Sequence, residues 1–182
     1  MPQVDPGPEG VANTGPDQVL IVGCGASLRC DDQVGLRVAE AISRAQLPPQ
    51  VRVKTSESPC ADLLAELASE RDVGLFVIID AAAPELGRPP GTWCRLDYRH
   101  QPQHIRTGDR SSLHGLGVDA AFEIAAEMGM LPPSVWVYVV ATAEVGYGEE
   151  MTPAVSAVIG ELNERIAADV KAWLGERTGK RA

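Results

Sequence analysis

The sequence is poor in aromatic residues and in histidine, with two Phe, three Tyr, three Trp and three His among 182 residues. Its apolar content is therefore mostly Ala, Val, Leu and Ile, a composition that suits helices packed on a buried β-sheet. No apolar run approaches the roughly 20 residues that a membrane-spanning helix needs. The length is sufficient for one domain with its own hydrophobic core.

Positive charge is also scarce, because 16 Lys and Arg residues stand against 25 Asp and Glu residues, for a formal net charge of −9. A nucleic-acid-binding protein needs a basic surface that displaces counterions from phosphates. Anionic membrane surfaces likewise attract basic segments. We therefore expect neither a nucleic acid nor a membrane as a partner.

Cysteine patterns that would indicate zinc or a redox pair are missing. The four cysteines form no C-x-x-C pair and have no zinc-ribbon spacing: Cys24, Cys30, Cys60 and Cys94. Residues 1–17 are rich in Pro and Gly and lack the basic and apolar regions of a signal peptide. We interpret them as a disordered leader. The expectation is a cytoplasmic protein whose free thiols fill small apolar spaces.

Hydrophobic patterns predict alternating strands and helices. Strands are expected over residues 18–23, 51–55, 75–80, 91–96 and 135–141. Helices are expected over 33–44 and 116–128, from Pro59, and as one long helix from Pro153. This order predicts an α/β three-layer sandwich, a mostly parallel, twisted five-stranded sheet with helices on both faces. The single domain should span residues 18–175, followed by a frayed tail over 176–182.

Two of the predicted strands differ in pattern. Residues 51–55 alternate between apolar and polar side chains, which favours a strand near the edge of the sheet. Residues 75–80 are continuously apolar up to Asp80, which favours a central strand. The connection after this second strand allows one antiparallel strand in the sheet.

The candidate site begins in Gly23–Gly35, a glycine-bearing turn between a strand and a helix that contains Asp31 and Asp32. In α/β sheets such loops, outside the carboxyl ends of the strands, carry the chemistry. Asp80 ends an apolar strand, where a carboxylate must be capped, paired or bound to a cation. His114 stands between glycines that allow close backbone approach. Together Asp32, Asp80 and His114 offer two carboxylates and an imidazole, a plausible open site for a divalent ion of intermediate softness.

Each of these residues also has a structural interpretation. One carboxylate of the Asp31–Asp32 pair could cap the following helix. Asp80 could form an Asx-type turn with Ala82 or Ala83. A lone histidine such as His114 is more often structural than functional.

Two further patterns are weaker. Gly23-Cys24-Gly25 could begin a dinucleotide fingerprint, but Leu28 stands where the packing glycine is needed, and the adjacent acids would repel a pyrophosphate. His100 and His104 have the spacing of two ligands on a helix. Because Pro102 lies between them, a helix is excluded, and we interpret both as solvated loop residues.

Four motifs together resemble the hydrogenase maturation endopeptidases, the proteases that process the large subunit of nickel–iron hydrogenases. Gly23–Gly35 is similar to the family's Gly-x-Gly-Asn…Asp-Asp/Glu-x-x-Gly. Ile78–Ala81 is similar to its apolar strand ending in Asp-Ala, and Ser112–Gly117 to its Ser/Thr-x-His-x-x-Gly. Gly148–Val155 is similar to its Gly…Leu-Thr-Pro-x-Val. The resemblance covers about residues 19–174.

The resemblance implies a peptidase that removes a C-terminal peptide from the nickel-loaded large-subunit precursor, and we expect the enzyme to be a monomer. The nickel would be held by the precursor and recognised by Asp32, Asp80 and His114, which are also the implied catalytic residues. Ala26 replaces the family's usual Asn, and Thr55–Cys60 replaces a Gly-rich segment implicated in substrate choice.

The sequence leaves the mechanism and two other functions open. Nickel could polarise the scissile carbonyl or supply a bound water, or a carboxylate could act as general base while nickel only anchors the precursor. The alternative functions are a metal-dependent hydrolase of a small molecule and a non-catalytic chaperone of the hydrogenase precursor.

Overall fold

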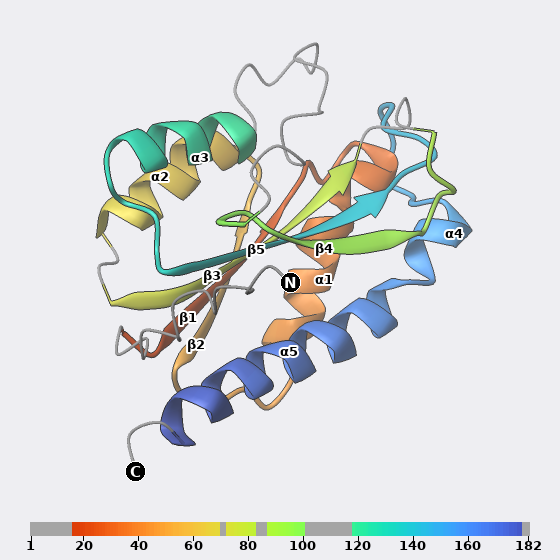
Figure 1. Ribbon diagram of the computed structural model, residues 1–182. Coiled ribbons are helices and arrows are strands. Elements are labelled where there is room, and N and C mark those ends of the chain that lie inside the picture. The colour runs from red at the N-terminus through yellow and green to blue at the C-terminus, as the bar shows by residue number, and fades with distance from the viewer. Residues whose placement is uncertain (1–15, 70–71, 83–86, 101–117, 180–182) are drawn as a thin grey trace, which may run out of the picture.

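In the computed structural model, which describes residues 16–69, 72–82, 87–100 and 118–179, strands and helices alternate along the chain (Figure 1). The elements are, in order, β1 (Gln18–Cys24), the 3-10 turn η1 (Cys30–Gln33), α1 (Val34–Ser43), β2 (Val51–Ser56), α2 (Pro59–Ser69), β3 (Val73–Ala82), β4 (Trp93–Asp97), α3 (Val118–Glu127), β5 (Ser134–Ala141), α4 (Pro153–Ser156) and α5 (Ile159–Gly179).

The strands form one five-stranded sheet in the order β2-β1-β3-β5-β4. The pairs β1–β2, β1–β3 and β3–β5 are parallel, and β4 runs antiparallel to β5. The mostly parallel sheet with one antiparallel strand is therefore confirmed. The alternating strand β2 lies at an edge and the apolar strand β3 in the middle, as their patterns predicted.

Helices cover both faces of the sheet, and successive residues of β1 face opposite layers. Val19 and Ile21 pack in one core with residues of α1 and α5. Leu20 and Val22 pack in a second core with residues of α2 and α3. Figure 1 shows the same arrangement, with α2 and α3 on one side of the sheet and α1 and α5 on the other. The predicted three-layer sandwich is confirmed.

The prediction of one long helix from Pro153 is wrong in detail, because a turn separates α4 from α5. The Val158 N–H donates to the Val155 carbonyl at 3.3 Å, an i→i−3 bond that tightens the chain where an α-helix would use i→i−4. The helical repeat of apolar residues continues through the turn, since Val155, Leu162 and Ile166 are all buried.

The ends of the domain also differ from the expected boundaries. Helix α5 continues to Gly179, so residues 176–179 belong to it instead of to a frayed tail. Arg177 is buried, and its Nε lies 3.1 Å from Oδ1 of Asp17. Asp17, expected in the leader, is therefore attached to the domain. The rest of the expected leader and tail, residues 1–15 and 180–182, lies outside the described residues.

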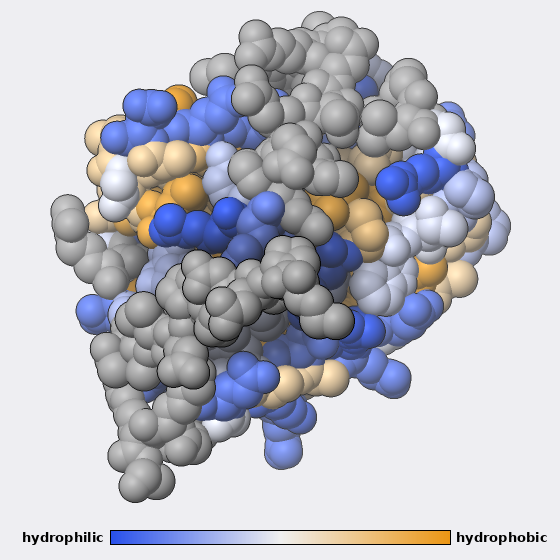
Figure 2. All heavy atoms as spheres, viewed as in Figure 1, coloured by the Kyte–Doolittle hydropathy of each residue, from blue (hydrophilic) through white to orange (hydrophobic). Residues whose placement is uncertain are grey.

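All four cysteines are free. The prediction of thiols in apolar spaces is confirmed for Cys24 and Cys60, which pack in the core with α2 and α3; Cys30 is buried outside both cores, and Cys94 is only partly buried. Hydrophilic residues cover much of α5 in the face drawn in Figure 2. No helix in the described ranges is long and apolar enough to cross a membrane.

Candidate functional site

Glycines set the shape of the turn after β1. Gly25 has a φ of +147°, which L side chains rarely adopt, and a Cβ there would overlap the carbonyl oxygen of Asp32. A Cβ on Gly35 would overlap the carbonyl oxygens of Cys24 and Ile79. The first turn of α1 can therefore lie directly against the ends of β1 and β3. A dinucleotide fingerprint would place the packing glycine at position 28. Here Leu28 is exposed, and Gly35 makes the close contact between helix and strands instead.

This packing places Asp32 and Asp80 at the same edge of the sheet. The pKa of the Asp80 carboxyl is raised to about 7, mainly by burial and also by the negative charges of Asp32 and Asp119. The Ala81 N–H opposes this effect by donating to Oδ1 of Asp80 at 2.9 Å. This bond goes to the residue directly after Asp80, and Ala83, one of the two partners considered for an Asx-type turn, lies outside the described residues. The two predicted site carboxylates are thus within reach of each other's charge.

The prediction that Asp31 or Asp32 caps the following helix is wrong. Both acids lie in η1, and the N-cap residue of α1 is Gln33, with no side-chain cap. Both acids therefore come before the N-cap residue, within the 3-10 turn that leads into α1. Asp32 is half-buried, and its N–H donates to the Arg29 carbonyl at 2.9 Å.

Asp31 has a structural role that the sequence did not reveal. Its buried carboxylate accepts hydrogen bonds from the backbone N–H groups of Ala143, Glu144 and Thr152 at 2.9, 3.1 and 2.7 Å. The Thr152 hydroxyl donates to the same carboxylate at 2.9 Å. Asp31 therefore fastens the loop between β5 and α4 to the turn that contains Asp32. The only hint of this role in the sequence was that two adjacent acids stand where one would be enough to cap a helix.

Replacing Asp31 should destabilise the protein. We expect Asp31→Ala to lower the free energy of unfolding by about 2–4 kcal/mol, because the donors around the carboxylate lose a charged acceptor inside the protein. Denaturant unfolding measures this change. Glu150→Ala, an exposed acid on the same loop, serves as the control and should change stability by less than about 0.5 kcal/mol. Equal stability of the two variants would contradict the assigned role of Asp31.

The third predicted ligand, His114, lies outside the described residues, as do His104 and the Ser112–Gly117 motif. His100 is an exposed loop residue, as predicted, with Nδ1 3.0 Å from Oδ2 of Asp97. Within the described residues, no three His, Cys, Asp or Glu side chains are grouped as a metal site requires. The structure therefore places two of the three predicted ligands.

Solved structures with a similar fold include three endopeptidases. The chain is 23% identical to the hydrogenase maturating endopeptidase HybD from E. coli, over 85% of this chain and 93% of that one, with a TM-score of 0.71. An endopeptidase from Escherichia coli gives 24% identity, the same coverage and a TM-score of 0.74. The chain is 23% identical to the [NiFe] hydrogenase maturation protease HycI from Thermococcus kodakarensis, over 88% of this chain and 96% of that one, with a TM-score of 0.64.

The chain has the fold of the hydrogenase maturation endopeptidases. This likeness confirms the predicted fold class and the fold that the motif resemblance implied. No family model matches the sequence, and no curated protein matches it either.

In this maturation endopeptidase fold, the segment Thr55–Cys60 lies beside the glycine turn. The Gly25 N–H donates to the Ser56 carbonyl at 3.2 Å. The Ser56 hydroxyl is buried and donates to Oδ2 of Asp62, in the first turn of α2, at 2.6 Å. The segment that departs from the family pattern is therefore part of the same edge as Asp32.

A cysteine nucleophile is disfavoured at this edge. Burial raises the pKa of the Cys24 thiol well above its usual value, and the charges of Asp80, Asp62 and Asp32 raise it further. A reactive cysteine needs a lowered pKa and an electropositive surrounding. The carboxylates are thus the groups at this edge that are suited to bind a cation or move a proton.

Proposed function

We propose that this protein is an endopeptidase that removes the C-terminal peptide from the nickel-loaded large-subunit precursor of a nickel–iron hydrogenase. The observation that carries the proposal is the pair Asp32 and Asp80, within reach of each other's charge at the carboxyl edge of the sheet, in a fold shared with maturation endopeptidases.

The electrostatics of this pair support a cationic partner. Two carboxylates that raise the cost of each other's ionisation are stabilised when a divalent cation arrives between them. In the proposed complex that cation is the nickel already ligated by the precursor. Asp32 and Asp80 contribute oxygen ligands, and His114 contributes an imidazole nitrogen.

Binding of the precursor's nickel brings the scissile peptide to the edge of the sheet. A metal beside the peptide polarises its carbonyl group towards attack by water. Water adds to the carbonyl carbon, the C–N bond breaks, and the proton that the water gives up passes to the leaving amine. The enzyme thereby cuts only a precursor that has received its metal.

The free enzyme should hold metal weakly. Its proposed ligands are two carboxylates and one imidazole with no thiolate, so the free enzyme lacks the nitrogen and sulfur donors of a tight site for a borderline metal. After dialysis, elemental analysis should find far less than one metal ion per chain. One zinc or nickel per chain that survives dialysis and supports cleavage of an unloaded precursor would contradict this and favour a conventional metal-dependent hydrolase.

Cleavage itself is tested by mass spectrometry of the precursor after incubation with the enzyme. We expect loss of a C-terminal peptide. Stable binding of the precursor without any change in its mass would contradict the peptidase function and favour a non-catalytic chaperone.

A further inference from the structure

The turn that contains Asp32 and the loop before α4 are hydrogen-bonded into one unit. The Arg29 guanidinium donates from Nε and Nη2 to the Val145 carbonyl at 3.1 and 3.0 Å. The Cys30 N–H donates to the Gly148 carbonyl at 2.9 Å, and the Gly148 N–H donates to the Leu28 carbonyl at 3.0 Å. The two loops therefore move together and present one surface beside the proposed site.

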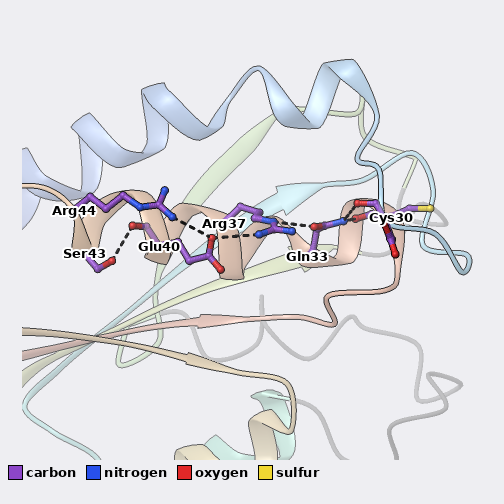
Figure 3. Close-up of polar contacts among 7 residues, drawn as sticks. Cys30, Gln33, Arg37, Glu40, Ser43 and Arg44 are labelled. Atoms are coloured by element: carbon purple, nitrogen blue, oxygen red, sulfur yellow. Dashed lines mark hydrogen bonds and ion pairs between the residues drawn. The ribbon is translucent and has the colours of Figure 1, made fainter.

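The side chain of Gln33, the last residue of η1, bonds to both parts of this unit, and Arg37 of α1 bonds to Gln33 in turn. Figure 3 shows Gln33 between Arg37 and Cys30. Gln33 Nε2 donates to the Cys30 carbonyl at 2.9 Å and to the Glu149 carbonyl at 2.8 Å, while its Oε1 accepts from Arg37 Nε at 2.9 Å. Because both loops are fixed by these bonds, a ligand that binds them has little conformational entropy to remove.

Two large apolar side chains are exposed on this unit. Leu28 is 59% exposed and Tyr147 is 89% exposed. The Arg29 guanidinium carbon lies 5.7 Å from the centroid of the Tyr147 ring. Single exposed apolar residues are ordinary, but these two lie on bonded loops, and Leu28 is four residues before Asp32. Exposed Glu144, Glu149 and Glu150 belong to the same loop as Tyr147.

We propose that Leu28 and Tyr147 form a docking surface for the nickel-loaded precursor, which binds there through a segment with a basic side chain beside an apolar one. This inference rests on the proposed function. The aromatic ring and the leucine provide rigid apolar contact of the kind that dominates protein interfaces. The exposed glutamates of the Tyr147 loop attract a basic segment and repel an acidic one.

A second copy of this chain fits the surface poorly. It would bring the same glutamates face to face, in a protein whose formal net charge is already −9. The precursor is the partner that must in any case come to this edge, because in the proposed function its nickel binds Asp32, and the turn that contains Asp32 is hydrogen-bonded to the loop that carries Tyr147. The docking surface is therefore continuous with the proposed site.

The test compares cleavage by the wild type and by the double variant Leu28→Ala/Tyr147→Ala, with the nickel-loaded precursor as substrate. We expect KM to rise about tenfold or more, as for the loss of interface anchors, with kcat within about twofold and an unchanged melting temperature. Met128→Ala is the matched control. This side chain is 65% exposed and lies between the end of α3 and the start of β5, whereas the proposed site lies at the carboxyl ends of the strands.

The charge part of the proposal is tested by Glu149→Gln/Glu150→Gln. This variant should slow association with the loaded precursor and reduce the dependence of the association rate on salt. An association rate that keeps its value and its salt dependence would overturn the basic-segment requirement.

The outcomes separate the docking surface from the proposed function. Normal cleavage with an unchanged KM in the Leu28→Ala/Tyr147→Ala variant would overturn the docking surface and leave the peptidase intact. A loaded precursor that the wild type does not cut would overturn the proposed function. Sedimentation that shows a dimer of the wild type, lost in the double variant, would assign the surface to a second copy and overturn the docking proposal.

Discussion

Asp80→Asn should abolish cleavage of the nickel-loaded precursor while making the folded protein more stable at about pH 8. The amide keeps the shape of the carboxyl and can still accept from the Ala81 N–H, a bond of 2.9 Å in the wild type. It cannot supply a negative charge to a metal. Activity and stability therefore change in opposite directions, which a variant that merely disturbs the fold would not produce.

The sign of the stability change follows from the pKa of Asp80. Its folded-state pKa is about 7, against an ordinary value of 3.8, so the folded state binds the proton more tightly than the unfolded state does. The wild type loses stability as pH rises from about 4 to about 7, and the loss is complete above that range. At roughly 1.4 kcal/mol per pKa unit the full effect is about 4 kcal/mol. Because Asp80 is only half-buried, screening by solvent reduces this loss of stability to about 1–2 kcal/mol.

Denaturant unfolding at two pH values measures this effect. The advantage of Asp80→Asn over the wild type should fall to roughly half between about pH 8 and about pH 5.5, since the wild-type carboxyl is then protonated in the folded state. Glu127→Gln, which removes an exposed negative charge from α3, is the control and should cleave normally. Full cleavage by Asp80→Asn would remove Asp80 from the site.

Gly35→Ala should cost the protein about 3 kcal/mol or more of its free energy of unfolding. The added methyl group would overlap two backbone carbonyl oxygens, those of Cys24 and Ile79, and would approach the Cys24 nitrogen at 2.9 Å. Backbone atoms in a parallel sheet cannot rotate away as the end of a flexible side chain can. Helix α1 must then move off the sheet, and overpacking of this kind is strongly destabilising.

Gly160→Ala gives the matched control, because this glycine is also helical and a Cβ there would meet nothing within 4 Å. It should raise the free energy of unfolding by about 0.5–1 kcal/mol, the usual gain when alanine replaces glycine inside a helix. Both variants are measured by denaturant unfolding. A Gly35→Ala variant as stable as the wild type would contradict the close contact between α1 and the ends of β1 and β3.

The sequence predicted those parts of the fold that depend on local patterns. The alternation in β2 and the continuous apolar run in β3 gave their places at the edge and in the centre of the sheet. The break between α4 and α5 was missed because the helical spacing of Val155, Leu162 and Ile166 continues through it. Periodicity records which side chains face the core and is insensitive to a tightened turn.

The role of Asp31 could not be predicted for a different reason. Its partners Ala143, Glu144 and Thr152 lie 112 to 121 residues further along the chain. The sequence showed a pair of adjacent acids, and a cap was the local explanation. Only the fold shows that Asp31 fastens a distant loop, while Asp32 lies near Asp80.

The account is tested most directly by one precursor prepared in two states, nickel-loaded and metal-free, and incubated with the dialysed enzyme. Mass spectrometry of the C-terminus should show complete loss of the terminal peptide from the loaded precursor and no loss from the metal-free one. Asp32→Asn should leave both intact. Equal cleavage of the two precursors by the wild type, or cleavage of neither, would contradict the claim that this protein reads the precursor's nickel through Asp32 and Asp80.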